Sequence, residues 1–284
     1  MWRIVAIAHC LLTSDSQQPM VAPTLLALDF DGVLCNGLVE YFQTAWKAYC
    51  QIFDVADKTP PSGLAERFYP LRPVIETGWE MPLLLHALQQ GVDDAAVLDR
   101  WQALVQDILA ETGIQADAAM AQVDGVRDRW IQTDLDGWLS LHQFYPGVIE
   151  RLQAAIAAGV YLVIISTKEG RFIQALLAKA GVELATSQII GKEIKQPKTD
   201  TLSQLLQDPP QSHPAPLTIW FVEDRLKTLE KVKARPDLSN IPLFLADWGY
   251  NTNAEKEQAR RDSRIHLLSL DLLVQEFSEW MVSN

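Results

Sequence analysis

Two aspartates with one residue between them follow an apolar run near the start of the chain. The run Leu25–Leu28 has the composition of a buried strand, and Asp29 and Asp31 come directly after it. Because side chains alternate along an extended chain, both carboxylates are expected to point to the same side where the strand ends, and Gly32 lets the chain turn away. Such a pair can bind a divalent cation through oxygen atoms, or can divide into a nucleophile and a proton-transfer group.

A calcium-binding loop of the EF-hand type also begins with this D-x-D spacing, and Glu40 stands at the twelfth position of such a loop. The sixth position is occupied by Leu34, where the sharp turn needs Gly, and an apolar strand rather than a helix precedes the loop. The sequence therefore argues against calcium binding. A strand end with two solvated carboxylates is the structural alternative.

Chemically useful side chains also follow two later apolar runs that we predict to be strands. These are Tyr161–Ile165, followed by Ser166, Thr167 and Lys168, and Leu217–Val222, followed by Glu223 and Asp224. Ligands of open parallel sheets bind beyond the carboxyl ends of the strands, so these side chains are expected to converge on Asp29 and Asp31. Acids that hold a metal, a hydroxyl and an ammonium group together suit the binding of a phosphoryl group.

The ammonium group is expected to come from Lys198 rather than Lys195. Lys198 immediately precedes a predicted helix whose leucines face the core, and Thr199 or Asp200 is expected to cap that helix. Lys195 lies in a polar turn without such an anchor. The fixed lysine can reach a phosphate with little loss of side-chain freedom.

The elements between these strands follow two patterns. From Leu38 to Leu135 apolar residues recur at helical spacing, interrupted by a proline-rich break from Pro60 to Pro73. From Tyr145 onward helices and strands alternate, which predicts right-handed crossovers and a parallel sheet covered on both faces. The individual predictions are helices at Pro82–Gln90, Ala95–Ala110, Ala116–Leu135, Val148–Ala158, Arg171–Ala180 and Leu268–Phe277, and strands at Thr186–Ile190 and, as the last strand, Ile241–Ala246.

The 284 residues, 48% of them hydrophobic, can form a real core in one large domain or two modest ones. We expect an N-terminal extension (residues 1–19) outside the fold, an α/β core domain (20–36 and 145–284) and an inserted α-helical domain (37–144). The 24 Lys and Arg against 36 Asp and Glu give a net charge of -12, which argues against nucleic acid or an anionic membrane as a partner. Three cysteines without C-x-x-C spacing favour a reducing cytoplasm and argue against zinc.

Four motifs, taken in order, resemble those of haloacid dehalogenase (HAD) superfamily phosphatases. LDFDGVL looks like the first motif, VIISTKEG the second, KTDTLSQLL the lysine motif and FVEDR the acidic fourth motif. FYPGVIERLQAAIAAGV and LADWGYN resemble connecting segments of the phosphoglycolate-phosphatase-like branch, whose inserted helical cap corresponds in type and position to residues 37–144. The resemblance covers residues 25–277. The sequence departs from the common G-D-x-x-x-D pattern, since Glu223 replaces the Gly and Thr228 the last acid.

The resemblance implies a Rossmann-like (HAD-type) fold and a magnesium-dependent phosphatase. Asp29 would attack phosphorus to form an aspartyl phosphate, and Asp31 would protonate the leaving group and then activate water. Ser166 and Lys198 would bind phosphate oxygens. The implied ligands of Mg²⁺ are Asp29, the backbone carbonyl of Asp31, Glu223 and Asp224.

The predicted substrate-binding residues lie in both parts of the chain: Gly32, Thr167, Lys168 and Arg72. The predicted partner is a small phosphorylated metabolite, and phosphoglycolate is the leading candidate by analogy. Hydrolytic dehalogenases lack the second aspartate, so Asp31 argues against that activity, and no cap lysine has the setting that a phosphonatase requires. A sugar phosphomutase of the same fold and a catalytically idle binding or regulatory protein remain as alternatives.

Overall fold

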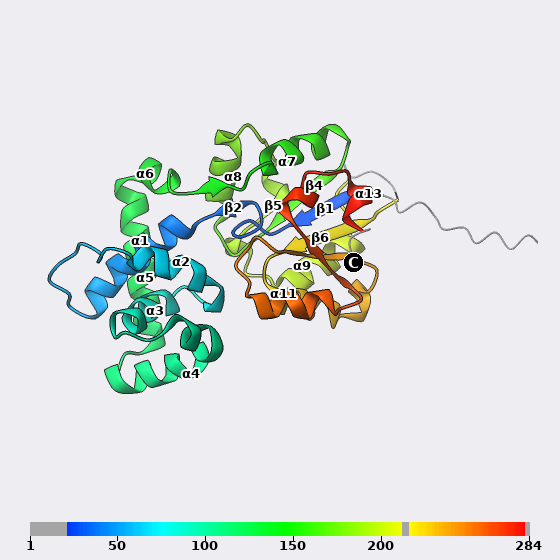
Figure 1. The fold of residues 1–284 in the computed structure, drawn as a ribbon. Coiled ribbons are helices and arrows are strands. Elements are labelled where there is room, and N and C mark those ends of the chain that lie inside the picture. Colours follow the sequence, from blue (N-terminus) through cyan, green and yellow to red (C-terminus); the bar gives the residue numbers. More distant parts are fainter. Residues whose placement is uncertain (1–21, 212–215, 282–284) are drawn as a thin grey trace, which may run out of the picture.

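The computed structural model describes residues 22–211 and 216–281. The predicted extension (residues 1–19) lies outside them. Within the described ranges, six parallel strands form one sheet in the order β5-β4-β1-β6-β7-β8 (Figure 1). The strands are β1 Leu25–Leu28, β4 Tyr161–Ile165, β5 Ile189–Ile190, β6 Ile219–Glu223, β7 Leu243–Ala246 and β8 Ile265–Leu268. The predicted parallel α/β fold is confirmed, with β1 between β4 and β6.

Helices cover both faces of the sheet. They are α7 Val148–Ala157, α8 Gly170–Lys179, α9 Lys198–Gln207, α10 Leu226–Lys233, α11 Asn253–Arg260, α12 Leu270–Leu273 and α13 Phe277–Trp280. Leu26 and Leu28 of β1 pack in one cluster with residues of α7, α8 and α13, whereas Leu25 and Ala27 pack with α9 and α10 on the other face. This alternation explains why β1 is apolar at every position.

A separate block of helices lies beside the carboxyl edge of the sheet (Figure 1). It contains α1 Leu38–Ile52, α2 Leu64–Leu71, the 3-10 turn η1 Arg72–Val74, α3 Glu80–Gln89, α4 Asp94–Thr112, α5 Ala116–Thr133 and α6 Leu135–Leu139. Its helices bury a hydrophobic cluster of their own, which includes Phe68, Leu84 and Trp101. The chain enters the block through β2 (Cys35–Asn36) and leaves through β3 (Gln143–Phe144), and these short strands pair antiparallel. No helix within the described residues is both long and apolar enough to span a membrane.

The predicted proline-rich break is wrong in its middle, because α2 forms there with Pro70 inside it. Leu64, Phe68 and Leu71 are buried at helical spacing on α2, so their packing outweighs the low helix propensity of proline. Pro70 is the seventh of eight residues, so its missing N–H removes the one hydrogen bond that would run back to the carbonyl of Glu66, four residues earlier.

Three further predictions differ from the structure. The predicted strand Thr186–Ile190 begins as a 3-10 turn, Thr186–Gln188, and pairs with β4 only at Ile189–Ile190. The strand Ile241–Ala246 is not the last one, because β8 follows it and pairs with β7. The predicted terminal helix Leu268–Phe277 is replaced by two short helices, α12 and α13. Its first residue, Leu268, belongs to β8. The short β8 was missed because half of its residues are only partly buried and its pattern is weak.

Candidate active site

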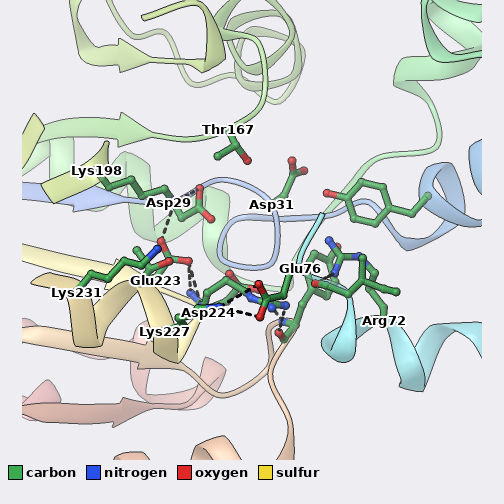
Figure 2. Close-up of a pocket in the computed structure, with 15 residues that line it drawn as sticks. Asp29, Asp31, Arg72, Glu76, Thr167, Lys198, Glu223, Asp224, Lys227 and Lys231 are labelled. Atoms are coloured by element: carbon green, nitrogen blue, oxygen red, sulfur yellow. Dashed lines mark hydrogen bonds and ion pairs between the residues drawn. The ribbon is translucent and has the colours of Figure 1, made fainter. Parts of the chain in front are cut away.

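One cleft of about 270 Å³ lies at the carboxyl ends of β1, β4 and β6, where the sheet faces the helical block (Figure 2). The sheet side of its wall contains Asp29, Asp31, Thr167, Lys198, Glu223 and Asp224, and the helical block adds Tyr41, Arg72, Ile75 and Glu76. The sheet side alone thus brings together residues from four stretches of the chain that are distant in sequence, as expected at the carboxyl edge of an open parallel sheet.

The backbone after β1 holds the two aspartates in place. The amide of Asp29 donates to Val222 O at 2.9 Å, which extends the pairing with β6 by one residue. The chain then turns at Gly32, whose amide donates to Cys35 O at 2.8 Å. Gly32 has a φ of 86°, and a Cβ there would lie 2.1 Å from Asp224 Oδ2. Only glycine permits both this conformation and this close approach.

Lys198 joins two of the acids. Its Nζ lies 2.9 Å from Asp29 Oδ1 and 2.7 Å from Glu223 Oε2. Burial alone would lower the pKa of Lys198, but the attraction of Asp29 and Glu223 outweighs burial and holds the pKa above its usual value. The lysine is therefore a fixed cation beside Asp29.

The structure does not bring Lys195 to the acids. Lys195 is exposed, in a left-handed conformation after the 3-10 turn Lys192–Ile194. The expected capping of α9 by Thr199 or Asp200 is wrong. The helix begins at Lys198 after Pro197, no side chain caps it, and Asp200 instead pairs with Arg235 at 2.9 Å. Proline fixes the backbone angle before the helix, which anchors Lys198 without a capping side chain.

Among the described residues, Asp29, Glu223 and Asp224 form a buried group whose ligand oxygens lie within 4.8 Å of one another. Burial raises the pKa of Asp29 to about 7, although Lys198 opposes the shift, and burial and the charge of Glu223 raise the pKa of Asp224 well above its usual value. Lys198 does not balance three carboxylates. This set of oxygen donors with excess negative charge fits a Mg²⁺ ion.

Glu223 differs from the other two acids in its hydrogen bonds. Its Oε1 accepts from the backbone amides of Asp224 and Arg225 at 3.1 and 3.0 Å, and its Oε2 accepts from Lys198. Asp224 Oδ2 accepts from the amide of Tyr250 at 2.7 Å. Glu223 is thus well placed to orient Lys198, while Asp224 lies beside it in the buried group of oxygen donors.

The residues after β4 take two positions. Lys168 Nζ lies 3.2 Å from Asp31 Oδ2, and Thr167 lines the cleft. Ser166 is buried, its Oγ accepts from the amide of Lys168 at 3.3 Å, and it does not line the cleft. Within the part of the chain that the structure describes, the buried Oδ1 of Asp31 has no hydrogen-bond partner. One oxygen of Asp31 is therefore paired and the other is available to carry a proton.

Sequence reasoning missed the residues that connect the helical block to the sheet. Arg225 Nη1 donates to Pro73 O at 3.0 Å, and Lys227 Nζ lies 2.8 Å from Glu76 Oε1. Tyr250 supports Asp224 through its amide, and its hydroxyl accepts from the amide of Gly37 at 2.9 Å. Arg225 and Tyr250 lie within the FVEDR and LADWGYN segments and Lys227 lies two residues after the first, but the segments gave no indication of contacts with the helical block.

No protein-family model matches the chain, and neither does any curated protein sequence. Solved structures do match. A predicted phosphoglycolate phosphatase from Haemophilus somnus 129pt has 16% sequence identity and a TM-score of 0.53, over 92% of this chain and 97% of that one. A protein described as a haloacid dehalogenase-like hydrolase from Bacteroides fragilis has 17% identity and a TM-score of 0.50, over 88% and 99%. Protein Tyrosine Kinase A of Mycobacterium tuberculosis has the same identity and TM-score, over 89% and 96%. At these identities the comparison establishes a shared fold, and the chain has the α/β fold of HAD-like proteins.

Proposed function

We propose that the protein is a magnesium-dependent phosphatase that hydrolyses a small phosphorylated metabolite through an aspartyl-phosphate intermediate. The observation that carries this proposal is the position of Lys198, between Asp29 and Glu223, which form one buried acidic group with Asp224 at the carboxyl edge of the sheet. A fixed cation and an excess of acids around one carboxylate are suited to a phosphoryl group, whose oxygens are charged in the transition state.

In the first half-reaction Asp29 attacks phosphorus. Its Oδ1 pairs with Lys198, so Oδ2 is the attacking atom. A bond forms between this oxygen and phosphorus as the bond from phosphorus to the leaving oxygen breaks. Asp31 donates a proton from Oδ1 to the leaving oxygen, since its Oδ2 is held by Lys168.

In the second half-reaction water attacks the phosphorus of the aspartyl phosphate. Asp31 Oδ1 takes a proton from this water, and the bond from Asp29 to phosphorus breaks to release phosphate. Lys198 and a hydroxyl after β4, from Ser166 or Thr167, bind phosphate oxygens in both steps. Lys198 stays paired with Glu223 throughout, which keeps it in position.

Magnesium would be held by Asp29, the backbone carbonyl of Asp31 and Asp224, with Glu223 available as a further ligand. The ion would neutralise negative charge on the phosphoryl oxygens when bound.

We further propose that residues 37–144 act as a cap domain over a core of residues 20–36 and 145–284. The contacts of Arg225 with Pro73 and of Lys227 with Glu76 support this role, because they hold the helical block over the cleft. A closed cap excludes bulk water and selects the leaving group. Phosphoglycolate is the first substrate to test, on fold-level analogy. The buried free thiols of Cys35 and Cys50 agree with action in a reducing cytoplasm.

Phosphate release tests the proposal. The protein should release phosphate from p-nitrophenyl phosphate and from phosphoglycolate with Mg²⁺ and not after removal of the metal by a chelator. A phosphomutase would instead move phosphate between positions of a sugar, and a binding protein would release none. Absence of metal-dependent phosphate release from every ester in a broad metabolite panel would reject the proposal.

A further inference from the structure

Arg72 lies where the cleft continues into a second cavity. It belongs to η1 and lines both the cleft and a neighbouring chamber of about 440 Å³ between the helical block and the sheet edge. The close-up view places Arg72 on the opposite side of the cleft from Lys198 (Figure 2). A group bound at Arg72 is therefore separate from the phosphoryl group beside Lys198.

Two aromatic rings fix the guanidinium group of Arg72. Its Cζ lies 5.0 Å from the ring centroid of Tyr41 in α1 and 5.0 Å from that of Tyr250, which follows β7. The two rings are themselves 5.8 Å apart. Because cation–π contacts hold the group from two elements, Arg72 is preorganised for a ligand.

Arg72 also has one buried donor atom without a partner and no acid partner among the described residues. Its Nη1 donates to Ile75 O at 3.1 Å, whereas its buried Nε has no hydrogen-bond partner in residues 22–211 and 216–281. No carboxylate in these residues pairs with it. By contrast, Arg127 pairs with Glu40 and Lys168 with Asp31 on the same chamber wall. A guanidinium group that lines a cavity and pairs with no carboxylate is suited to an anion.

The chamber is large for the leaving group of phosphoglycolate. One methylene carbon and a carboxylate occupy the space of a few water molecules, at about 30 Å³ each. The chamber also has apolar walls, formed in part by Met81, Val123 and Phe172. Its size and lining fit a leaving group of three carbons up to a sugar.

We propose that the substrate is a phosphate monoester whose leaving group carries a second anionic group, a carboxylate or a phosphate, and that Arg72 binds this group in the chamber. The proposal rests on the phosphatase function proposed above and adds the substrate class. The second anion pairs with Arg72 while the phosphoryl group that is transferred to Asp29 lies beside Lys198.

Matched esters that differ in the second anion test the proposal. We would compare kcat/KM for 3-phosphoglycerate with glycerol 3-phosphate, for phosphoglycolate with 2-hydroxyethyl phosphate, and for fructose 1,6-bisphosphate with fructose 1-phosphate. The first two pairs test recognition of a carboxylate on the leaving group, and the third pair tests recognition of a second phosphate. The wild-type protein should prefer the anionic member of at least one pair by about tenfold or more, the gain expected from charged hydrogen bonds.

Variants assign that preference to Arg72. Arg72→Gln should reduce the ratio to below about threefold, and Arg72→Lys should keep part of it because the charge remains without the planar fork. Arg129→Gln is the matched control, since Arg129 is exposed on α5 and lines neither cavity. Its ratio should equal that of the wild type. A wild-type ratio near one in all pairs, or a ratio that survives Arg72→Gln, would overturn the proposal, while metal-dependent phosphate release in the same assay would leave the proposed function intact.

A binding measurement separates failure of the inference from failure of the proposed function. The melting temperature of the Asp29→Asn variant, which should not consume the esters, should rise more with the anionic member of the preferred pair than with the neutral one. Equal rises for both members in every pair would contradict binding at Arg72 whether or not the protein is a phosphatase.

Discussion

Two buried clusters of charged side chains differ in net charge. The cluster inside the helical block is balanced, whereas the cluster at the sheet edge has an excess of carboxylates. In the helical block, Glu40 is completely buried, and its Oε1 accepts from Thr44, Arg127 and Trp138 at 2.7, 2.8 and 3.0 Å. Burial alone would raise the pKa of Glu40, but Arg127 and these hydrogen bonds outweigh it and lower the pKa to about 2. The carboxylate of Glu40 is therefore ionised, paired with Arg127 and fully hydrogen-bonded.

At the sheet edge, burial raises the pKa of Asp29 to about 7, and burial together with the charges of Glu223 and Asp29 raises the pKa of Asp224 well above its usual value. Lys198 pairs with only two of these three carboxylates, Asp29 and Glu223. The comparison suggests a general distinction. A buried cluster that balances its own charge stabilises the fold, whereas an unbalanced one is maintained for a ligand that supplies the missing charge.

The largest effect is expected for the proposed nucleophile. Asp29→Asn should lower kcat by about 10⁴-fold or more, as removal of a catalytic nucleophile does. The variant should melt at or above the temperature of the wild type, because it removes one charge from an unbalanced cluster. Phosphate release and a thermal melt measure both. A variant that is active, or that melts well below the wild type, would contradict the idea that the cluster at the sheet edge serves a ligand rather than the stability of the fold.

A smaller loss is expected for the lysine. Lys198→Met should lower kcat by about 10²- to 10³-fold, the effect of removing one electrostatic contact to a transition state. Lys195→Met is the matched control, three residues before Lys198 in the turn that precedes α9, and its turnover should stay close to that of the wild type because Lys195 is exposed. If the Lys195 variant lost activity and the Lys198 variant kept it, the assignment of the cation would be reversed.

The metal requirement should distinguish the two adjacent acids. Asp224→Asn should raise the Mg²⁺ concentration for half-maximal activity by about 10- to 100-fold, comparable to losing a group that supports a metal. Glu223→Gln should change this concentration less and lower kcat more, since Glu223 orients Lys198. Titration of activity with Mg²⁺ measures both, and equal shifts for the two variants would show that they share one role.

The smallest effect on turnover, and the largest on stability, should come from the balanced cluster. Glu40→Gln leaves Arg127 without its partner and should cost about 3 kcal/mol of unfolding free energy. The pKa of Glu40 is lower in the folded protein than its ordinary value of 4.5, so its contribution is complete above that pH and is lost as pH falls towards 2. Urea unfolding at pH 7 and pH 3 should therefore show a smaller difference between wild type and variant at pH 3. A difference that is independent of pH would contradict the ionised state of Glu40.

The sequence predicted the sheet side of the site because its signals are local. An apolar strand that ends in acids, as at Asp29 and at Glu223, can be predicted from residues that are adjacent in the sequence. Parallel strands then bring such ends together. The prolines around α2 hid the helix that leads into Arg72, and the short β8 had too little pattern to be recognised. Local propensity is a weak guide where packing decides the structure.

The other side of the site depends on contacts between distant residues. Arg72 is fixed by Tyr41 and Tyr250, which are separated from each other by more of the chain than any local pattern spans. Glu40 stood out in the sequence only as a failed calcium ligand, because Arg127 reaches it from another helix. Whether a buried charge is balanced becomes visible only when its three-dimensional neighbours are known.

The most direct test of the account is to detect the phosphorylated intermediate on Asp29. The protein would be mixed with Mg²⁺ and p-nitrophenyl phosphate, quenched in acid during turnover, digested and examined by mass spectrometry. The account predicts a phosphoryl group on the peptide that contains Asp29, and its absence in the Asp29→Asn variant and in the presence of a chelator. Steady phosphate release with the phosphoryl group on another residue, or on none, would contradict it.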